Sequence, residues 1–389
     1  MITNSQPSPE ELLLIALCRL DFSAEQSEAA KALSAKVTDW EYFVKLANEH
    51  GISSLVHHNL EKLGLTGPMP EKELAFLKNA NMLSMARNAA MMGMLSKAVS
   101  DTKLKTVLLK GAALELIVYG NNGLRQMSDI DLLLTKEDCM KAYRLLQEKG
   151  FKPLEIKSVF HRSIISYIGK HLPSLIRGGM SVELHHRLFD EEDENLTSLL
   201  YESSKPFDLS GVTVYLPDLA VFFLYLVKHL DSHELTNESQ LRLHADLVVL
   251  LERFYDMIIS EDLLKYTAGA GLDKALASKL QLLAEFWEFG FPAFMQEFIS
   301  INYDESRRGK FIYFLRRPKN NPRVEKSSLY RKNLGKIPGL HRKFLYVAGD
   351  LFPTLTFMKE RYRCSSALKA ALYYPHRWGK IMWLLTWRF

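Results

Sequence analysis

The helical pattern of this 389-residue chain is interrupted near its middle by short apolar segments with the spacing of β-strands. The segment TVLLK at 106–110 is apolar and partly β-branched, and Gly111 and the helix-forming stretch AALELIVYG follow it at once. After a polar loop, SDIDLLLT at 128–135 alternates polar and apolar residues and then continues apolar, as a half-covered central strand does. We therefore predict an α+β fold, with a small mixed sheet flanked by N-terminal and C-terminal helical segments.

Local signals on both sides support this division. A serine, a proline and a glutamate at Ser8–Glu11 form a capping box, and a helix from Lys136 is closed by Gly150. The segments HLPSLIR and MSVELHHRL flank Gly178–Gly179, a pattern that predicts an antiparallel hairpin. We expect four regions: an N-terminal helical segment (1–105), a core (106–190), a helical domain (191–304) and a basic C-terminal extension (305–389).

A further long helix is expected between Leu77 and Lys103, a stretch rich in Met, Ala and Leu. Methionine is flexible and fills irregular gaps between packed side chains. We therefore interpret the methionines of this helix as core residues rather than as a ligand surface. They are Met82, Met85, Met91, Met92 and Met94.

Composition restricts the cellular setting. No segment approaches the 18 or more apolar residues of a spanning helix, and the longest apolar run, Leu219–Val227, is bounded by Asp218 and Lys228. The N-terminus has acidic residues where a signal peptide has basic ones, so export is not expected. Three widely separated cysteines without CxxC spacing are typical of reduced thiols. We predict a cytoplasmic protein without a transmembrane segment.

Charge is distributed unevenly along the chain. Residues 305–389 carry 20 Lys and Arg against 4 Asp and Glu, whereas residues 1–304 carry 30 against 41. The basic extension is therefore expected to meet something anionic: the acidic body, nucleotide phosphates, a nucleic acid such as tRNA, or a membrane surface. Its last segment contains Trp378, Trp383 and Trp387 among basic residues, which fits an interfacial helix or, in our preferred interpretation, a terminal helix packed on the body.

Candidate catalytic residues lie on the second predicted strand. Asp129 and Asp131 are two positions apart, so both carboxylates project from one face of that strand. Mg²⁺ prefers oxygen ligands and usually takes one or two protein carboxylates, so the pair predicts a magnesium site. Glu183 supplies a third carboxylate if its strand lies beside that of the aspartates. Two ions are expected, and Mn²⁺ is an alternative to Mg²⁺.

The turn at Lys110–Gly111 complements these acids. Glycine lets a phosphate approach the backbone, and the start of the following helix presents N–H groups. Lys110 and Arg125 add positive charge for a triphosphate. Phosphoryl transfer depends mainly on positioning and on neutralising developing charge, so these residue types suit that chemistry.

The segments LLKGAALELIVYGNNGLRQMSDIDLLL and SVELHHRL resemble the polymerase-beta-type nucleotidyltransferase superfamily, and more closely its bacterial branch of uncharacterised nucleotidyltransferases. The resemblance implies transfer of a nucleoside monophosphate from an NTP such as ATP to an acceptor hydroxyl or phosphate, with release of pyrophosphate. It implies Asp129, Asp131 and Glu183 as catalytic metal ligands. The nucleotide-binding residues that we expect are Lys110, Gly111, Arg125 and Ser128.

Two departures from the superfamily pattern stand out, since Ala112 follows Gly111 where serine or glycine is common, and Glu183 replaces the commoner aspartate. His185 and His186 are weaker candidates for orienting a carboxylate or contacting substrate. Asp246 is a weaker candidate for acting as a base or binding the acceptor.

Two other functions stay open. One is a non-catalytic nucleotide-binding or regulatory module, and the other is a toxin-like transferase acting on tRNA or protein.

Overall fold

The computed structural model describes residues 6–386, except 121, 155–156, 163, 165–168, 190–193, 236–238, 318–333 and 336. Trp387 of the predicted terminal helix and residues 318–333 of the basic extension lie outside the described residues. Two compact units make up the chain. The first comprises 1–100, 105–131 and 193–321, and the second comprises 101–104, 132–192 and 322–389.

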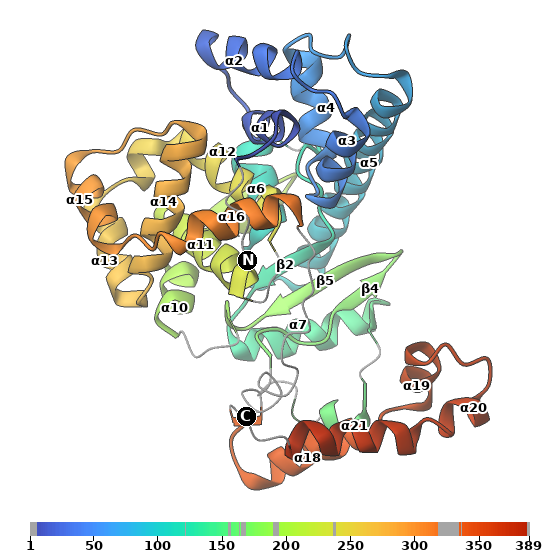
Figure 1. Ribbon diagram of the computed structural model, residues 1–389. Helices are drawn as coiled ribbons and strands as arrows, with labels where there is room; N and C mark the ends of the chain where they lie inside the picture. Colours follow the sequence, from blue (N-terminus) through green and yellow to red (C-terminus); the bar gives the residue numbers. More distant parts are fainter. Residues whose placement is uncertain are drawn as a thin grey trace. The chain divides into compact units, whose positions relative to one another are not determined.

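The first unit is mainly helical (Figure 1). Its N-terminal helices are α1 (Pro9–Ala16), α2 (Ala24–Ser34), α3 (Trp40–Glu49), α4 (Ser53–Lys62) and α5 (Glu71–Thr102). Short helices α6 (Lys110–Leu114) and η1 (Glu115–Tyr119, a π-helical turn) follow. Its later helices are α10 (Glu194–Glu202), α11 (Leu219–Leu235), α12 (Leu241–Ile258), α13 (Glu261–Ala270), α14 (Asp273–Trp287), α15 (Ala293–Asn302) and α16 (Ser306–Arg316).

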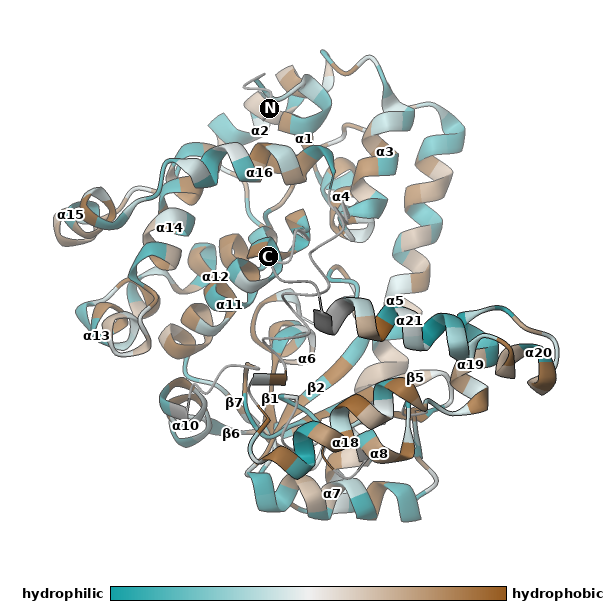
Figure 2. Cartoon of the chain, turned by 60° about the horizontal axis from the view of Figure 1, so that its bottom comes forward, coloured by the Kyte–Doolittle hydropathy of each residue, from teal (hydrophilic) through white to brown (hydrophobic). Residues whose placement is uncertain are grey.

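Apolar residues place α11 at the centre of the first unit. The helix is apolar on nearly every side over 219–227 (Figure 2), and residues 220–227 are all buried. A helix without a polar face is stable in water only when its neighbours cover it, as α12 and α14 do here. Ser8 caps α1 with Pro9 at its first position, which confirms the predicted capping box. α12 contacts η1, the π-helical turn that continues α6 after the predicted phosphate turn.

The long helix α5 differs from its prediction in one respect. Met91 and Met92 are buried, as expected of core residues, but Met82 and Met85 are 59% and 49% exposed. Sequence spacing alone did not distinguish the two ends of this helix, because its apolar residues are distributed around the axis.

The strands of the first unit are β1 (Val107–Leu108), β6 (Lys205–Leu209) and β7 (Val212–Leu216). β6 and β7 form an antiparallel hairpin, and β7 pairs in parallel with β1 through Val107 and Tyr215. The turn residues Ser210 and Gly211 both have positive φ, as two-residue hairpin turns often require. This hairpin is not among the elements predicted above.

The second unit carries the other half of the predicted core. Its elements are α7 (Lys136–Glu148), β3 (Lys152–Pro153), α8 (Val159–Arg162), β4 (Leu175–Arg177), β5 (Met180–His185), α18 (Leu340–Leu351), α19 (Leu355–Arg361), α20 (Ala367–Ala371) and α21 (Tyr374–Thr386). β4 and β5 pair antiparallel around Gly178 and Gly179, which confirms the predicted hairpin. Helix α7 begins at Lys136 as predicted, and Gly150 follows it with a φ of 88°.

Strand β2 (Asp129–Leu133) belongs to both units, because the division falls after Asp131. The seven strands follow the order β3-β4-β5-β2-β1-β7-β6. Both parallel and antiparallel pairs occur, so the sheet is mixed. The predicted α+β class, with helical segments flanking a mixed sheet, is confirmed. The four region boundaries predicted from sequence stay predictions.

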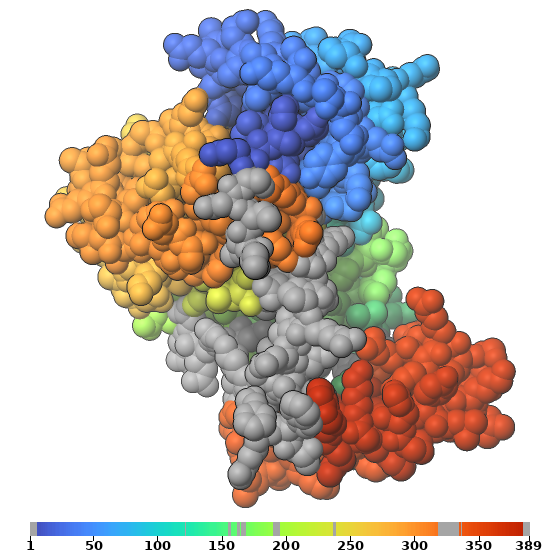
Figure 3. Space-filling view, viewed as in Figure 1, coloured from blue at the N-terminus to red at the C-terminus, as the bar shows by residue number. Residues whose placement is uncertain are grey.

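Acidic residues of the first unit bind the beginning of the basic extension. Figure 3 shows the orange surface that includes α16 against the blue N-terminal helices. Arg316 Nε lies 2.9 Å from Glu11 Oε1, and Arg307 Nη1 lies 2.5 Å from Asp231 Oδ1. These contacts concern α16 alone, so docking of the entire extension stays a prediction.

The rest of the described extension folds within the second unit. Asp350, which is 1% exposed, lies 3.7 Å from Arg377 Nη2 and forms an ion pair with Lys157. Trp378 Nε1 donates to the carbonyl oxygen of Leu351 at 2.8 Å, whereas Trp383 is 51% exposed. None of the described helices combines the length and apolar character needed to cross a lipid bilayer.

Candidate active site

Strand β2 positions the predicted acids between two neighbouring segments. The amide of Leu109, which follows β1, donates to the carbonyl oxygen of Asp131 at 3.0 Å. On the other side the amide of Leu134 donates to the carbonyl oxygen of His185 at 3.0 Å. Ile130 and Leu132 are buried, as the alternation predicts. The backbone of β2 is thus fixed at both edges where the aspartates project.

Asp131 is almost fully buried, with 1% of its surface exposed, and it forms an ion pair with Lys110. Lys110 Nζ donates to Asp131 Oδ1 at 2.7 Å. Burial alone would lower the pKa of Lys110, but the charge of Asp131 raises it above its usual value, so the lysine is held as a cation. The backbone of Lys110 has a φ of 42°, a left-handed conformation at the start of α6.

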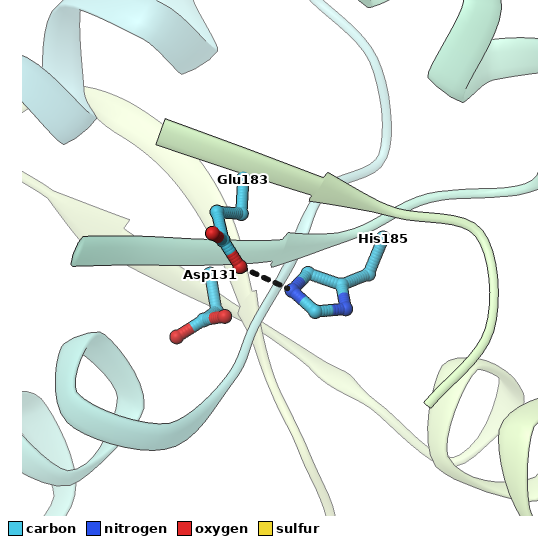
Figure 4. Close-up of side chains that lie close together, drawn as sticks. All are labelled: Asp131, Glu183 and His185. Atoms are coloured by element: carbon cyan, nitrogen blue, oxygen red, sulfur yellow. Dashed lines mark ion pairs between the residues drawn. The ribbon is translucent and has the colours of Figure 1, made fainter. Parts of the chain in front are cut away.

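Three potential metal ligands meet at β2 and β5. One ligand atom from each of Asp131, Glu183 and His185 lies within 4.8 Å of the others (Figure 4). Glu183 Oε2 is 3.5 Å from His185 Nε2, the ion pair drawn in that figure. Ser174 Oγ donates to Glu183 Oε1 at 2.9 Å and fixes the carboxylate.

This donor set fits a divalent cation. Two carboxylates in so small a space repel each other unless a cation or a proton compensates them. Oxygen ligands suit Mg²⁺, and an added imidazole is compatible with Mn²⁺ as well. The cluster of Asp131, Glu183 and His185 is therefore a site that could bind a metal ion.

Asp129 stands apart from this cluster among the described residues. It is half-buried at the first position of β2, and Ser128 Oγ donates to its Oδ1 at 2.9 Å. Ser128 itself is exposed, and its carbonyl oxygen accepts from Arg87 Nη2 at 3.1 Å. The predicted ligand Asp129 and the predicted nucleotide residue Ser128 are thus neighbours that contact each other.

Arg125 and Asp246 form a separate, deeply buried ion pair. Arg125 Nε is 2.8 Å from Asp246 Oδ1, and Arg125 Nη2 is 2.9 Å from Asp246 Oδ2, so the contact is bidentate. The hydroxyl of Tyr119 donates to the same carboxylate at 3.1 Å. Arg125 is only 7% exposed, so its guanidinium is engaged inside the protein. Contact of Arg125 with a nucleotide stays a prediction, as does the acid–base role considered for Asp246.

Gly111 has a packing reason to be glycine. A Cβ atom at this position would lie 2.5 Å from Arg125 Nη1 and 2.9 Å from Met127 Cγ. Both distances are well below ordinary contact, and the bidentate pair with Asp246 holds the Arg125 side chain in place. Glycine therefore lets α6 approach the 125–127 segment closely, whether or not a phosphate binds at this turn.

The sequence patterns did not identify Asn88 as part of this region, and they gave His185 only a weak candidacy. Asn88 Nδ2 on α5 donates to Glu115 Oε1 at 2.6 Å and to the carbonyl oxygen of Arg125 at 2.8 Å. No local pattern connects residues so far apart in the chain. His185 had a usable signal, since it follows Glu183 by two positions and therefore shares its face of β5.

Comparison with known proteins agrees with this geometry. None of the curated proteins compared with the chain matches it. A family model described as uncharacterised nucleotidyltransferase matches residues 36–288. The match includes α3–α5, the β2 acids, the β4–β5 hairpin, and Asp246 on α12. The chain therefore belongs to the family of uncharacterised nucleotidyltransferases.

Proposed function

We propose that the protein transfers a nucleoside monophosphate from an NTP to an acceptor hydroxyl or phosphate and releases pyrophosphate. The observation that carries the proposal is the cluster of Asp131, Glu183 and His185 in a chain of this family. Asp131 is buried and Glu183 is half-buried, and two carboxylates this close beside an imidazole favour a bound cation between them. We assign this activity to the cytoplasm, where NTPs are abundant and the three free cysteines would stay reduced.

Asp131 and Glu183 would hold the metal, with Asp129 as a further acid on the same strand face and His185 as a nitrogen ligand. A bound Mg²⁺ or Mn²⁺, with a second ion in the usual arrangement, supplies charge neutralisation for a triphosphate and acidifies an acceptor hydroxyl. Ser174 orients Glu183 through its hydrogen bond of 2.9 Å. Lys110 balances the charge of Asp131 through their ion pair of 2.7 Å.

The nucleotide contacts that we propose involve Lys110, the backbone at Gly111, and Ser128. Lys110 brings an ammonium group next to the acidic cluster, which suits a triphosphate. Arg125 supports the same turn from behind, because its guanidinium packs where a side chain at position 111 would be. A direct contact of Arg125 with phosphate is a further proposal, which would require its pair with Asp246 to open.

A transfer assay with α-³²P-labelled NTPs tests the proposal against small-molecule, RNA and protein fractions of the host cell. Metal-dependent label in one fraction is the expected result and identifies the acceptor class. Label in tRNA or protein would favour the toxin-like alternative. Metal-dependent NTP binding without any transfer would replace the proposal with the nucleotide-binding module.

Two variants on β5 and beside it test the assignment of Glu183. Glu183→Gln removes one candidate ligand, whereas His186→Ala changes a neighbouring histidine outside the cluster of described ligands. We expect the Glu183 variant to lose about 10²–10³-fold in transfer and the His186 variant to lose little. Equal losses would show that Glu183 is not the third acid.

A further inference from the structure

A cavity of about 490 Å³ lies in the first unit beside the start of β2. Its walls come from α3, α5, α12 and the 126–128 segment. Pockets for small molecules commonly have volumes of about 300–1,000 Å³, so this one suits a single metabolite-sized ligand. Neither Lys110 nor Gly111 lines it among the described residues, so it is separate from the predicted phosphate turn.

Two arginines give the cavity a positive wall. Arg242 Nη1 donates to the carbonyl oxygen of Gln126 at 2.8 Å, and its Nη2 donates to Gln240 Oε1 at 3.0 Å. Its Nε is buried and has no hydrogen-bond partner within the described part of the chain. Arg87 donates to the carbonyl oxygen of Ser128. Neither arginine forms an ion pair with a carboxylate there, so both contact neutral oxygens.

The electrostatics of Arg242 agree with a missing counter-charge. Burial, and after it the nearby charge of Arg125, lower its pKa to about 10 against weaker opposing effects of Asp246 and Asp129. Guanidinium groups bind carboxylates and phosphates through paired hydrogen bonds. An anionic group in the cavity would therefore stabilise both arginines.

Part of the cavity lining is apolar. Phe76 and Leu83 project from α5, and they are 44% and 71% exposed, respectively. Met127 extends this surface from the segment before β2. Large apolar side chains at the wall of a cavity are typical of ligand sites, because the ligand covers them.

Ser128 connects the cavity to the proposed reaction site. It lines the cavity, and its Oγ donates to Asp129 Oδ1 at 2.9 Å. A molecule in the cavity therefore lies next to the acidic end of β2, where an acceptor has to be for transfer.

We propose that this cavity binds the acceptor, and that the acceptor carries a carboxylate or phosphate group next to an apolar part. The anion contacts Arg87 and Arg242, and the apolar part packs on Phe76 and Leu83. This inference rests on the proposed function, since an acceptor presupposes the transfer, but binding at the cavity is measured without NTP or metal.

Three ¹⁹F-labelled probes test the chemistry on the full chain by NMR titration: 4-fluorophenyl phosphate, 4-fluorophenylacetate and 4-fluorobenzyl alcohol. We expect one or both anions to bind at least 10-fold more tightly than the neutral alcohol. The tighter of the two anions identifies phosphate or carboxylate as the recognised group. Failure of both anions to bind, or equal binding of all three probes, would overturn the proposal.

Matched variants locate the binding. Arg242→Gln and Arg87→Gln should each weaken the preferred anion at least 10-fold, whereas Arg253→Gln, an exposed arginine farther along α12, should change it less than 2-fold. Ala80→Trp fills the cavity without altering charge and should abolish binding, which provides a second test if an arginine variant fails to fold. Unchanged affinity in Ala80→Trp would place the probe elsewhere and overturn the assignment.

Affinity for MgATP separates the two sites. It should change less than 2-fold in Arg242→Gln, because Arg242 is not among the nucleotide contacts proposed above. Loss of MgATP binding in this variant would show that the cavity holds the nucleotide and would overturn the acceptor assignment. If the probes bind but the labelled NTP transfers no label to any fraction, only the proposed function is contradicted. If label is transferred but no probe binds, only this inference is contradicted.

Discussion

The first unit contains two buried pairs of a cation with an aspartate, and they are built differently. Arg125 and Asp246 share a bidentate contact, and Tyr119 adds a third hydrogen bond. Lys110 meets Asp131 through a single ammonium group, on a carboxylate that also belongs to a potential metal cluster. The planar guanidinium of Arg125 holds its partner in one fixed geometry, whereas the flexible side chain of Lys110 can exchange partners.

The difference indicates that the two neighbouring ion pairs have different roles, one in the stability of the fold and the other at the proposed reaction site. Gly111 lies between the two pairs, next to Lys110 in sequence and against Arg125 in space. The Arg125 pair supports the turn from inside the protein, and the Lys110 pair is at the acidic cluster. Variants of each pair should therefore affect different measurements.

Asp246→Ala should have the largest effect, and it should be on stability. The variant leaves the Arg125 guanidinium buried without its counter-charge, which typically costs about 3–5 kcal/mol in the free energy of unfolding. Urea denaturation of the wild type and the variant measures the loss. A loss below about 1 kcal/mol would mean that the Arg125–Asp246 pair does not stabilise the fold.

Asp131→Asn should affect chemistry more than folding. We expect transfer to fall about 10²–10³-fold, which corresponds to about 2.7–4 kcal/mol, because a metal-binding carboxylate is lost. Stability should fall by only about 1 kcal/mol, since the flexible Lys110 chain can turn toward water. Calorimetry with Mg²⁺ and ATP provides the binding measurement, and wild-type affinity in the variant would contradict the assignment.

Gly111→Ala tests whether the two pairs are coupled. The added methyl group would collide with Arg125 Nη1 and Met127 Cγ, at a cost of about 1–3 kcal/mol in stability. Because the collision displaces the turn, transfer should also fall in protein that remains folded. Gly269→Ala, with no atom within 4 Å of its added methyl group, serves as the control. Normal stability in Gly111→Ala would show that the close approach is not required.

Glu115→Gln should have the smallest effect, and it should depend on pH. Burial raises the pKa of Glu115 from 4.5 to about 7, although Arg125 opposes this shift. Between these values the folded chain binds more protons than the unfolded chain, so wild-type stability decreases as the pH rises. The neutral variant lacks this slope and should be more stable at pH 8 by on the order of 1 kcal/mol. Denaturation curves at pH 4.5 and pH 8 measure it, and an equal difference at both values would contradict the prediction.

Much of the fold was predictable because its signals are local. The Ser8 capping box, helix α7 and the β4–β5 hairpin each depend on residues within one turn or one loop. The β6–β7 hairpin had a similar signal in VTVYL after Ser210–Gly211, but the long apolar helix that follows obscured it. Its parallel pairing with β1 depends on residues about a hundred positions apart, which no local pattern records.

The candidate site was predictable to a smaller extent. Alternation along a strand was enough to nominate Asp131 and Glu183, and the structure brings them together with His185. The partner of Arg125 was not predictable, because Asp246 lies 121 positions away and any buried acid could have filled that place. Pairing of distant charges depends on the packing of whole helices, and single-sequence patterns do not encode it.

The parallel pairing of β7 with β1 also determines which fragments of this chain can be handled in isolation. A fragment that ends at residue 190 lacks β7, so the carbonyl oxygen of Thr106 loses the amide of Tyr215 as its donor and β1 is left unpaired on that side. Exposed strand edges of this kind recruit other chains and promote aggregation. A catalytic fragment intended for crystallisation or library screening therefore has to extend past Leu216. It then includes the β6–β7 hairpin, which covers the edge of β1.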